Sequence, residues 1–419
     1  MDLIEIAKNC QRASFEYAEL SVAKKNQVLQ AMATLLDENR ELIYSVNTEE
    51  VNKAKERGLN EALVDRLTLT KARFDEMVNG VRHVATLDDP VGEILEGRVL
   101  PSGLKLLKKR VPLGVVGVIY ESRPNVTVDI AALCLKSGNG CILRGGSEAL
   151  ATNRLLHQIL QKALLSVGLN PHGVSFIDST DREIVGKLLT LDDYVDVIIP
   201  RGGEALQRRC KAQATIPVIT GGFGISHIFA DFNCDLDRAV SVIVNAKVQK
   251  PSACNALDTL LIHKDIVDEL LAKLVVALKP YKVCLVAHQD LKDKLLNLGY
   301  ENVVLGTDTD FDTEFLSLKM NITTVDGIAS ACEHLRKHKA SHSDAILTDS
   351  KSHANRFIAA AGSACVYVNA STRFTDGGQF GLGAEVAIST QKLHARGPMA
   401  LRELTSIQYV GEGDYLVRA

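Results

Sequence analysis

The stretch VPLGVVGVIYESRPNVTVD, residues 111–129, decides the fold class of this chain. Its apolar run Val115–Tyr120 is rich in β-branched side chains and predicts a buried strand. A polar turn follows, whose charged and amide side chains are costly to bury without a ligand or partner. The alternative is a capping turn, with Asn125 as the N-cap of a helix that starts at Val126. A strand that leads through a short turn into a helix is the building unit of parallel sheets, so this stretch predicts an α/β fold.

The same alternation of strands and helices continues towards the C-terminus. Before residue 226 the further strand-like runs fall at 141–143, 174–177, 195–199 and 217–219. After residue 230 a helix at 235–248 precedes strand-like runs at 259–263, 284–287 and 364–368. We therefore predict two α/β domains, and nucleotide sites in such parallel sheets lie at the carboxyl ends of the strands.

The two ends of the chain have a different character. Residues 1–86 predict helices, because apolar side chains recur at helical spacing and Thr70 is a plausible N-cap. The basic stretch 99–111 predicts a part-exposed extended ribbon, whose lysines discourage stray strand pairing; the alternative for this basic cluster is an anion site. The tail predicts two short strands, 406–410 and 414–417, around a glycine-containing turn. This hairpin is expected to pair with the ribbon or with another subunit.

Composition excludes several classes of protein. The chain has 419 residues, of which 46% are hydrophobic, and a formal net charge of −3, so a disordered chain is excluded and nucleic acid or an anionic membrane is not expected as the main partner. No apolar run approaches the roughly 18 residues of a membrane span, and the N-terminus lacks the order of a signal peptide. The nine cysteines form no C-x-x-C pair, which favours a reducing, cytoplasmic setting.

Two glycine pairs follow predicted strands and precede predicted helices. Arg144 precedes Gly145-Gly146-Ser147, and an arginine also precedes Gly202-Gly203. Such junctions present backbone N–H groups and a positive helix end to an anion, although each alone could be an ordinary tight turn. Two of them at neighbouring strand ends favour a phosphate-bearing ligand.

Cys254 differs from the other cysteines, most of which stand among apolar neighbours. It lies in a polar loop between a helix and a strand, close to Lys250 and Pro251, which suits an exposed, ionisable thiol. The alternative is an inert loop thiol. The polar run 369–378, which follows a predicted strand, is interpreted as a binding loop or as a plain surface connection.

The histidines do not predict a metal site. His334 and His338 are four residues apart, but Leu335 stands where a zinc-peptidase motif requires glutamate. We therefore expect them on a solvated helix face, and His227 and His342 receive no role.

Several long stretches resemble the gamma-glutamyl phosphate reductases, a family within the aldehyde dehydrogenase superfamily. The matching stretches are residues 111–129, 133–149, 195–203, 244–256, 342–348 and 366–398. The resemblance implies an aldehyde dehydrogenase-like α/β fold with a Rossmann-like cofactor domain, an α/β catalytic domain and a small β oligomerisation ribbon. The expected limits are 1–98 and 112–225 for the cofactor domain, 226–390 for the catalytic domain, and 99–111 with 391–419 for the ribbon and tail.

The resemblance also implies roles for single residues. Cys254 matches the nucleophile, and Asn125 matches the amide that holds the oxyanion together with the Cys254 N–H. The cofactor-binding residues that it implies are Arg144, Gly145, Gly146, Ser147, Gly202, Gly203 and Glu314. We interpret Arg123 and Arg373 as partners of the substrate's carboxylate and phosphate; the alternative is structural pairing with Asp376 or Glu121.

The implied activity is the NADPH-dependent reduction of L-glutamyl 5-phosphate to L-glutamate 5-semialdehyde and phosphate, a step of proline biosynthesis. The segment 218–224 contains no carboxylate that could activate water against a thioester, which suits a reductase. A homo-oligomer and transient contact with a glutamate kinase are expected as well. The rivals are a reductase of CoA thioesters, a non-enzymatic nucleotide-binding scaffold and a metal-dependent dehydrogenase.

Overall fold

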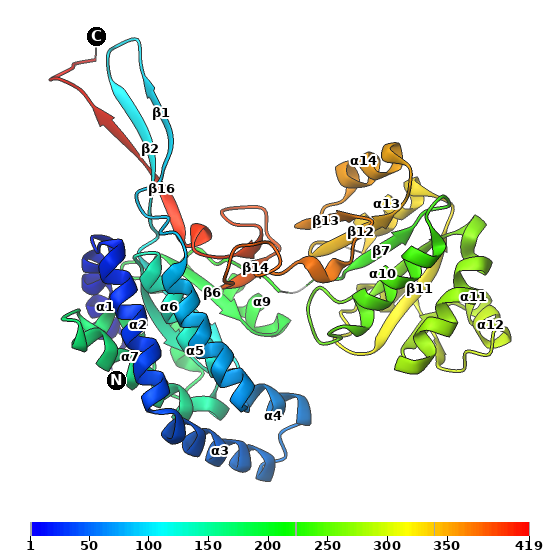
Figure 1. Cartoon of the computed structure of the whole chain (residues 1–419), viewed down its shortest axis with the longest axis horizontal. Coiled ribbons are helices and arrows are strands. Elements are labelled where there is room, and N and C mark those ends of the chain that lie inside the picture. The colour runs from blue at the N-terminus through cyan, green and yellow to red at the C-terminus, as the bar shows by residue number, and fades with distance from the viewer. Residues whose placement is uncertain (1, 223, 339, 419) are drawn as a thin grey trace. The chain divides into compact units, whose positions relative to one another are not determined.

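The computed structural model describes residues 2–222, 224–338 and 340–418 (Figure 1). The described residues divide into two compact units. Unit 1 contains the chain up to Thr220, Gly381–Ala387 and the residues from Met399 onward, and unit 2 contains Gly221–Phe380 and Ile388–Pro398. No helix of the described chain is both long and apolar enough to cross a bilayer.

The N-terminal region of unit 1 is helical, as predicted. The helices are α1 (Leu3–Ala18), α2 (Val22–Glu38), α3 (Arg40–Glu56), α4 (Glu61–Leu67) and α5 (Lys71–Thr86). Val28, Met32 and Leu36 of α2 are fully buried, which confirms the apolar stripe. The Thr70 side chain accepts a hydrogen bond from the Arg73 N–H, and this confirms the predicted N-cap of α5.

A parallel sheet with the strand order β5-β4-β3-β6 forms the centre of unit 1. Its strands are β3 (Val115–Tyr120), β4 (Gly140–Arg144), β5 (Val174–Phe176) and β6 (Val197–Arg201), and the helices that connect or follow them are α6 (Asn125–Lys136), α7 (Leu150–Ser166), α8 (Glu183–Leu188) and α9 (Glu204–Gln213). The chain passes from β3 to β4 on one side, whereas β6 lies on the other side of β3. The strand order therefore switches direction between β3 and β6, where ligands bind in open α/β sheets.

One predicted strand of this sheet was wrong. Residues 217–219 form an isolated bridge between Val218 and Ile198 rather than a strand. Pro217 has no N–H to donate, so this short run cannot extend a ladder along β6.

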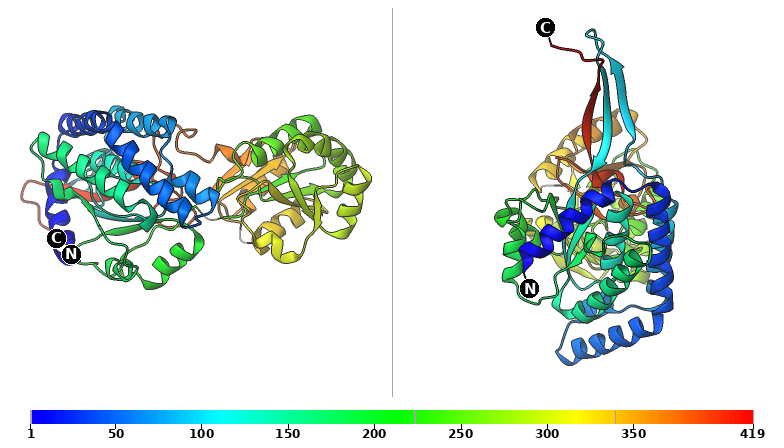
Figure 2. Two further views of the ribbon diagram at one scale, coloured as in Figure 1. Left: turned by 90° about the horizontal axis from the view of Figure 1, so that it is seen from below. Right: turned by 90° about the vertical axis from the view of Figure 1, so that its left-hand side faces the viewer.

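An antiparallel ribbon of β1 (Ile94–Val99), β2 (Lys105–Pro112) and β16 (Thr405–Glu412) extends from the rest of unit 1 (Figure 2). The tail pairs with the ribbon, with Thr405 opposite Pro112 and Glu412 opposite Lys105. The predicted second tail strand at 414–417 was wrong, because residues 413–418 have no strand structure and Tyr415 is 98% exposed. The ribbon also includes residues 94–98, which we had expected in the cofactor domain.

Unit 2 is built around a second parallel sheet, with the order β10-β9-β11-β8-β7-β12-β13. Its strands are β7 (His227–Ala230), β8 (Thr259–His263), β9 (Cys284–Ala287), β10 (Val303–Leu305), β11 (Lys319–Val325), β12 (Ser343–Leu347) and β13 (Cys365–Val368). The longer helices are α10 (Leu236–Val248), α11 (Val267–Leu278), α12 (Gln289–Asn297), α13 (Ile328–Lys337) and α14 (Lys351–Ala360). The short strands β14 (Ala387–Ser389) and β15 (Gly397–Met399) complete the assignment. The helix at 235–248 and the strands at 259–263 and 284–287 agree with the predictions.

Candidate active site

In unit 1, Asn125 is the first residue of α6, directly after the turn that follows β3. Pro124, not Asn125, occupies the N-cap position, so the predicted cap was wrong. The reason is that the Asn125 side chain has another partner: its Nδ2 donates to Oδ2 of Asp129, 2.8 Å away. Arg123 lies exposed just before this helix.

Arg144 is the last residue of β4 and is 9% exposed. Burial lowers the pKa of its guanidinium, an effect that Glu148 partly offsets. Among the described residues, the buried Arg144 Nε has no hydrogen-bond partner. Since an unsatisfied buried charged donor is costly, this strand end fits an anionic group of a ligand.

The glycines that follow Arg144 allow a close approach of the chain. A Cβ at Gly145 would lie 2.2 Å from Nδ2 of Asn153, and a Cβ at Gly146 would lie 2.4 Å from Oε1 of Glu148. The Glu148 carboxylate accepts hydrogen bonds from Ser122, at 2.6 Å, and from Ser147, at 3.3 Å. A side chain at Gly145 would therefore collide with the buried Asn153, and one at Gly146 would displace the Glu148 carboxylate.

The second glycine pair opens α9, with Gly203 at the N-cap. Oε1 of Glu121 accepts a hydrogen bond from the Gly203 N–H at 3.1 Å, and a Cβ at Gly202 would lie 2.6 Å from the same oxygen. The Glu121 carboxylate thus accepts a hydrogen bond from a backbone N–H at the start of α9, a position that favours a bound anion.

In unit 2, Cys254 lies in the loop that joins the end of α10 to the start of β8, and it is half-buried. Its carbonyl oxygen accepts a hydrogen bond from Oγ of Ser226, which directly precedes β7, at 3.5 Å. Cys254 therefore lies at the edge of the sheet where the parallel strands begin.

Arg373 reaches this edge from the polar loop that follows β13. Its Nη1 donates to Oδ1 of Asn255, and its Nε donates to Oε1 of Gln249 at 2.8 Å. Burial lowers the pKa of Arg373, and the Cys254 charge acts in the opposite direction. The guanidinium therefore interacts electrostatically with the thiol, and within the described residues of unit 2 its hydrogen bonds go to these amides rather than to Asp376.

A buried charged pair supports the Cys254 loop, and sequence reasoning missed it. Lys247 and Asp258 are 0% and 2% exposed; Lys247 Nζ donates to the Leu257 carbonyl at 2.7 Å. Burial lowers the pKa of Lys247 to about 8 and raises that of Asp258 to about 6. The Asp258 carboxylate accepts from the N–H groups of Ser226, at 3.2 Å, and Phe315, at 3.1 Å. Asp258 thus connects the start of β7, through hydrogen bonds, with the segment that contains Glu314. Glu314, the predicted ligand of the ribose, is half-buried.

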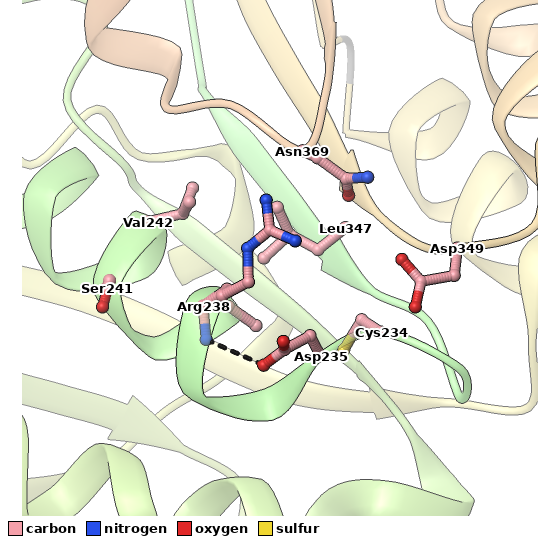
Figure 3. Close-up of a pocket in the computed structure, with 9 residues that line it drawn as sticks. Cys234, Asp235, Arg238, Ser241, Val242, Leu347, Asp349 and Asn369 are labelled. Carbon is pink, nitrogen blue, oxygen red and sulfur yellow. Dashed lines mark hydrogen bonds between the residues drawn. The ribbon is translucent and has the colours of Figure 1, made fainter.

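A cavity of about 280 Å³ in unit 2 lies at the opposite edge of the sheet (Figure 3). It follows β7 and β12, and the residues that line it include Cys234, Asp235, Arg238, Leu347, Asp349 and Asn369. None of the predicted site residues is among these lining residues. The strand order switches direction between β7 and β12, so the general rule for α/β sheets points to this cavity, whereas Cys254 lies elsewhere.

The predicted solvated face for His334 and His338 was wrong for His338. His338 is only 3% exposed. Its ring centroid lies 4.3 Å from that of His334 and 5.2 Å from that of Phe311. Its Nδ1 lies 3.2 Å from Oδ1 of Asp312. Burial lowers the pKa of His334 to about 3. No cluster of three or more His, Cys, Asp or Glu side chains suited to a metal ion was found within the described ranges.

The broadest comparison with known proteins places the chain in the aldehyde dehydrogenase family. The model of the aldehyde dehydrogenase family matches residues 1–290, and enzymes of this family use a nicotinamide cofactor. The acetylating aldehyde dehydrogenase of Geobacillus thermoglucosidasius superposes with a TM-score of 0.69 over 99% of this chain and 97% of its own, at 16% identity, which supports the fold alone.

Two further comparisons are far more specific. The gamma-glutamyl phosphate reductase of Tolumonas auensis is 53% identical over the whole of both chains. The crystal structure of gamma-glutamyl phosphate reductase from Thermotoga maritima has a TM-score of 0.96 and 43% identity, again over 100% of both chains. This chain belongs to the gamma-glutamyl phosphate reductases of the aldehyde dehydrogenase family, which confirms the resemblance and the predicted fold class.

Proposed function

We propose that this protein reduces L-glutamyl 5-phosphate to L-glutamate 5-semialdehyde and inorganic phosphate with NADPH, the second step of proline biosynthesis from glutamate. The observation that carries the proposal is a half-buried Cys254 with the Arg373 guanidinium in electrostatic reach, in a chain 53% identical over its full length to a reductase of this name. The nicotinamide supplies the hydride when it is bound.

Cys254 is the proposed nucleophile. Its thiolate attacks the acyl carbon of the substrate, the carbon–oxygen bond to phosphate breaks, and a thioester and inorganic phosphate result. Hydride addition to the thioester and release of the thiolate then give the aldehyde. The positive charge of Arg373 favours the thiolate form, because a nearby cation stabilises the ionised thiol.

Two donors are proposed for the oxyanion that forms when the thiolate attacks. These are the backbone N–H of Cys254 and the side-chain amide of Asn125, and one such donor is typically worth about 3 kcal/mol in the transition state. Arg123 and Arg373 are the proposed partners of the substrate's carboxylate and phosphate.

The cofactor is proposed to lie against the carboxyl ends of the unit 1 strands. The unpartnered Nε of Arg144 supports a role in binding the 2′-phosphate of NADPH, because guanidinium pairs well with phosphate. Gly145, Gly146 and Ser147 would form one cofactor turn, and Gly202 and Gly203 would face the pyrophosphate. Glu314 is the proposed ligand of the nicotinamide ribose.

Phosphate dependence tests the proposed function. Purified protein with glutamate semialdehyde and NADP should form NADPH only when inorganic phosphate is added, and CoA should not replace phosphate. A CoA-dependent reaction would instead identify a reductase of CoA thioesters. Absence of any NADP reduction would support a non-enzymatic scaffold, and loss of activity with a chelator would support a metal-dependent enzyme.

The proposal extends to the setting of the enzyme. A free nucleophilic thiol requires a reducing compartment, which favours the cytoplasm. The exposed ribbon side chains Val99, Ile407 and Tyr409 are proposed to serve in a homo-oligomer. Transient contact with the kinase that makes the labile acyl phosphate remains part of the hypothesis. Sedimentation velocity of the purified chain, alone and with a glutamate kinase, tests both associations.

A further inference from the structure

Helix α6 begins with an amide and carries a carboxylate one turn later. Asn125 and Asp129 are four residues apart, so their side chains lie on the same face of the helix. The amide nitrogen of Asn125 donates to Oδ2 of Asp129 at 2.8 Å. The pair is therefore joined by a hydrogen bond within one rigid helical turn.

The setting of Asp129 is unusual for a carboxylate of a helix surface. It is only partly exposed, and desolvation raises its pKa to about 6, against the opposing effects of the Asn125 bond and the Arg201 charge. No lysine or arginine forms a salt bridge with it among the described residues. Burial of this carboxylate therefore has a cost, and its hydrogen bond is to the amide of Asn125.

A carboxylate accepts hydrogen bonds and cannot donate them when it is ionised, so it fixes which end of an amide faces it. The Asn125 nitrogen must point towards Asp129, because a flipped amide would set its oxygen against the carboxylate. One N–H of the amide is used in this bond, and the second remains available in the same plane. A fixed amide loses less entropy when that second N–H binds a developing negative charge.

We propose that Asp129 is a positioning residue for the reaction: it holds the Asn125 amide so that its second N–H can donate to the oxyanion. The inference rests on the proposed function, because it takes Asn125 as an oxyanion donor. Asp129 itself touches neither substrate nor cofactor in this proposal.

The chain offers a matched control. Helix α12 also begins with an amide, Gln289, whose Nε2 donates to Oδ1 of Asp293, four residues later, at 2.7 Å. The chemistry and the spacing are the same, but no residue proposed for the reaction lies in α12. Substitution of Asp293 therefore measures how far the loss of such an amide–carboxylate pair at the start of a helix alters stability and kcat without any change at the proposed site.

A double-mutant cycle on phosphate-dependent semialdehyde oxidation tests the inference. We expect D129A to lower kcat about 10- to 30-fold, with the KM values for semialdehyde and NADP within about twofold. N125A should be slower still, and the double variant N125A/D129A should be no slower than N125A alone. D129N, whose amide oxygen can still accept from Asn125, should recover part of the rate, and D293A should leave kcat unchanged. Thermal unfolding of each variant shows whether it is folded.

The outcomes separate the inference from the function on which it rests. If N125A is slow but D129A and D129N are as fast as the wild type, Asp129 has no positioning role and the proposed function stands. If D129A slows the reaction equally with and without Asn125, Asp129 acts by another route, which also overturns the inference. If N125A keeps the wild-type rate, the oxyanion assignment itself is wrong, and the inference is overturned with it.

Discussion

The two parallel sheets place their proposed chemistry at opposite edges. In unit 1, Arg144 and the two glycine pairs lie where β4 and β6 end, and a helix starts after each strand. In unit 2, Cys254 lies where β7 and β8 begin, just after α10 has ended. Helix starts carry partial positive charge and helix ends partial negative charge. The unit 1 edge therefore favours phosphates through its backbone, whereas the unit 2 edge must obtain positive charge for a thiolate from a side chain, Arg373.

The contrast shows how far the rule for α/β sheets reaches. The switch point between β3 and β6 leads to the proposed cofactor turns, but the one between β7 and β12 leads to a cavity remote from Cys254. Strand order alone would therefore not have led to Cys254, the proposed nucleophile.

The largest effect is expected at the unit 2 edge. C254S should lower kcat by about 10³-fold or more, because a serine hydroxyl is far less ionised than a thiol at neutral pH. Steady-state NADPH formation measures the loss. C284S, which changes another half-exposed cysteine of the same sheet, is the control and should keep the wild-type rate. Near-normal turnover of C254S would exclude covalent catalysis at this residue.

The next effect is expected at the unit 1 edge. N125A removes the proposed side-chain donor and should lower kcat by about 10²- to 10³-fold while the protein stays folded. The kcat value shows whether the oxyanion donor has been lost, and the circular dichroism spectrum shows whether the variant is still folded. A folded variant with an unchanged rate would limit unit 1 to cofactor binding.

Arg373 tests whether the nucleophile edge depends on a side-chain cation. R373A should lower kcat/KM by about 10²-fold, and R373K should restore little, because lysine cannot reproduce a guanidinium that bonds both Gln249 and Asn255. The pH at which a thiol reagent alkylates Cys254 should move upwards in R373A. An unchanged alkylation profile would show that Arg373 does not support the thiolate.

Acid should destabilise unit 2 through His342, which is fully buried with its Nδ1 2.8 Å from the Ser343 hydroxyl. Burial lowers its pKa to about 4, with Asp344 opposing the shift. The unfolded chain takes up this proton near pH 6.5 and the folded protein only near pH 4, so stability falls as the pH falls through that window. About 2 kcal/mol should be lost between pH 7 and pH 5.

Chemical unfolding at pH 7 and pH 5 measures this loss of unfolding free energy. In H342N, whose new side chain cannot titrate, the loss between the two pH values should be smaller by about 2 kcal/mol. An equal loss in the wild type and in H342N would assign the acid sensitivity to other groups.

The smallest effect concerns Glu121, whose carboxylate occupies the Gly203 N–H. E121Q removes the negative charge that competes with a phosphate at this helix start, so the Kd for NADPH should fall about two- to fivefold. Quenching or enhancement of nicotinamide fluorescence measures the Kd. Weaker binding in E121Q would mean that Glu121 holds the turn in shape rather than competing with the cofactor.

Local sequence patterns predicted much of the fold. The apolar run of β8 and the helical stripe of α2 appear in the sequence itself, as do the glycine turns and the polar loop around Cys254. Two of the predictions that failed concerned side chains whose partners the sequence does not reveal. His338 is buried because Phe311 and Asp312 come from another segment, and Asn125 is not a cap because Asp129 binds its side chain.

Some features of the site had no local signal. Glu121 and Gly203 are 82 residues apart, and the two N–H groups bound by Asp258 belong to segments 32 and 57 residues away. Lys247 and Asp258 could have been noticed as charged residues beside apolar ones, but their burial appears only when the loop is packed against β8 and β11.

The sequence by itself predicted many of the elements, the family and Cys254 as the candidate for the reactive thiol, because these depend on residue types at short spacing. The tertiary structure decided at which edge of each sheet those residues lie and what they contact. The physical reason is that strand order, burial and the pairing of a carboxylate with an amide or a backbone N–H arise from packing between segments. Such packing depends on the free energy of the whole unit, not on any one stretch of the chain.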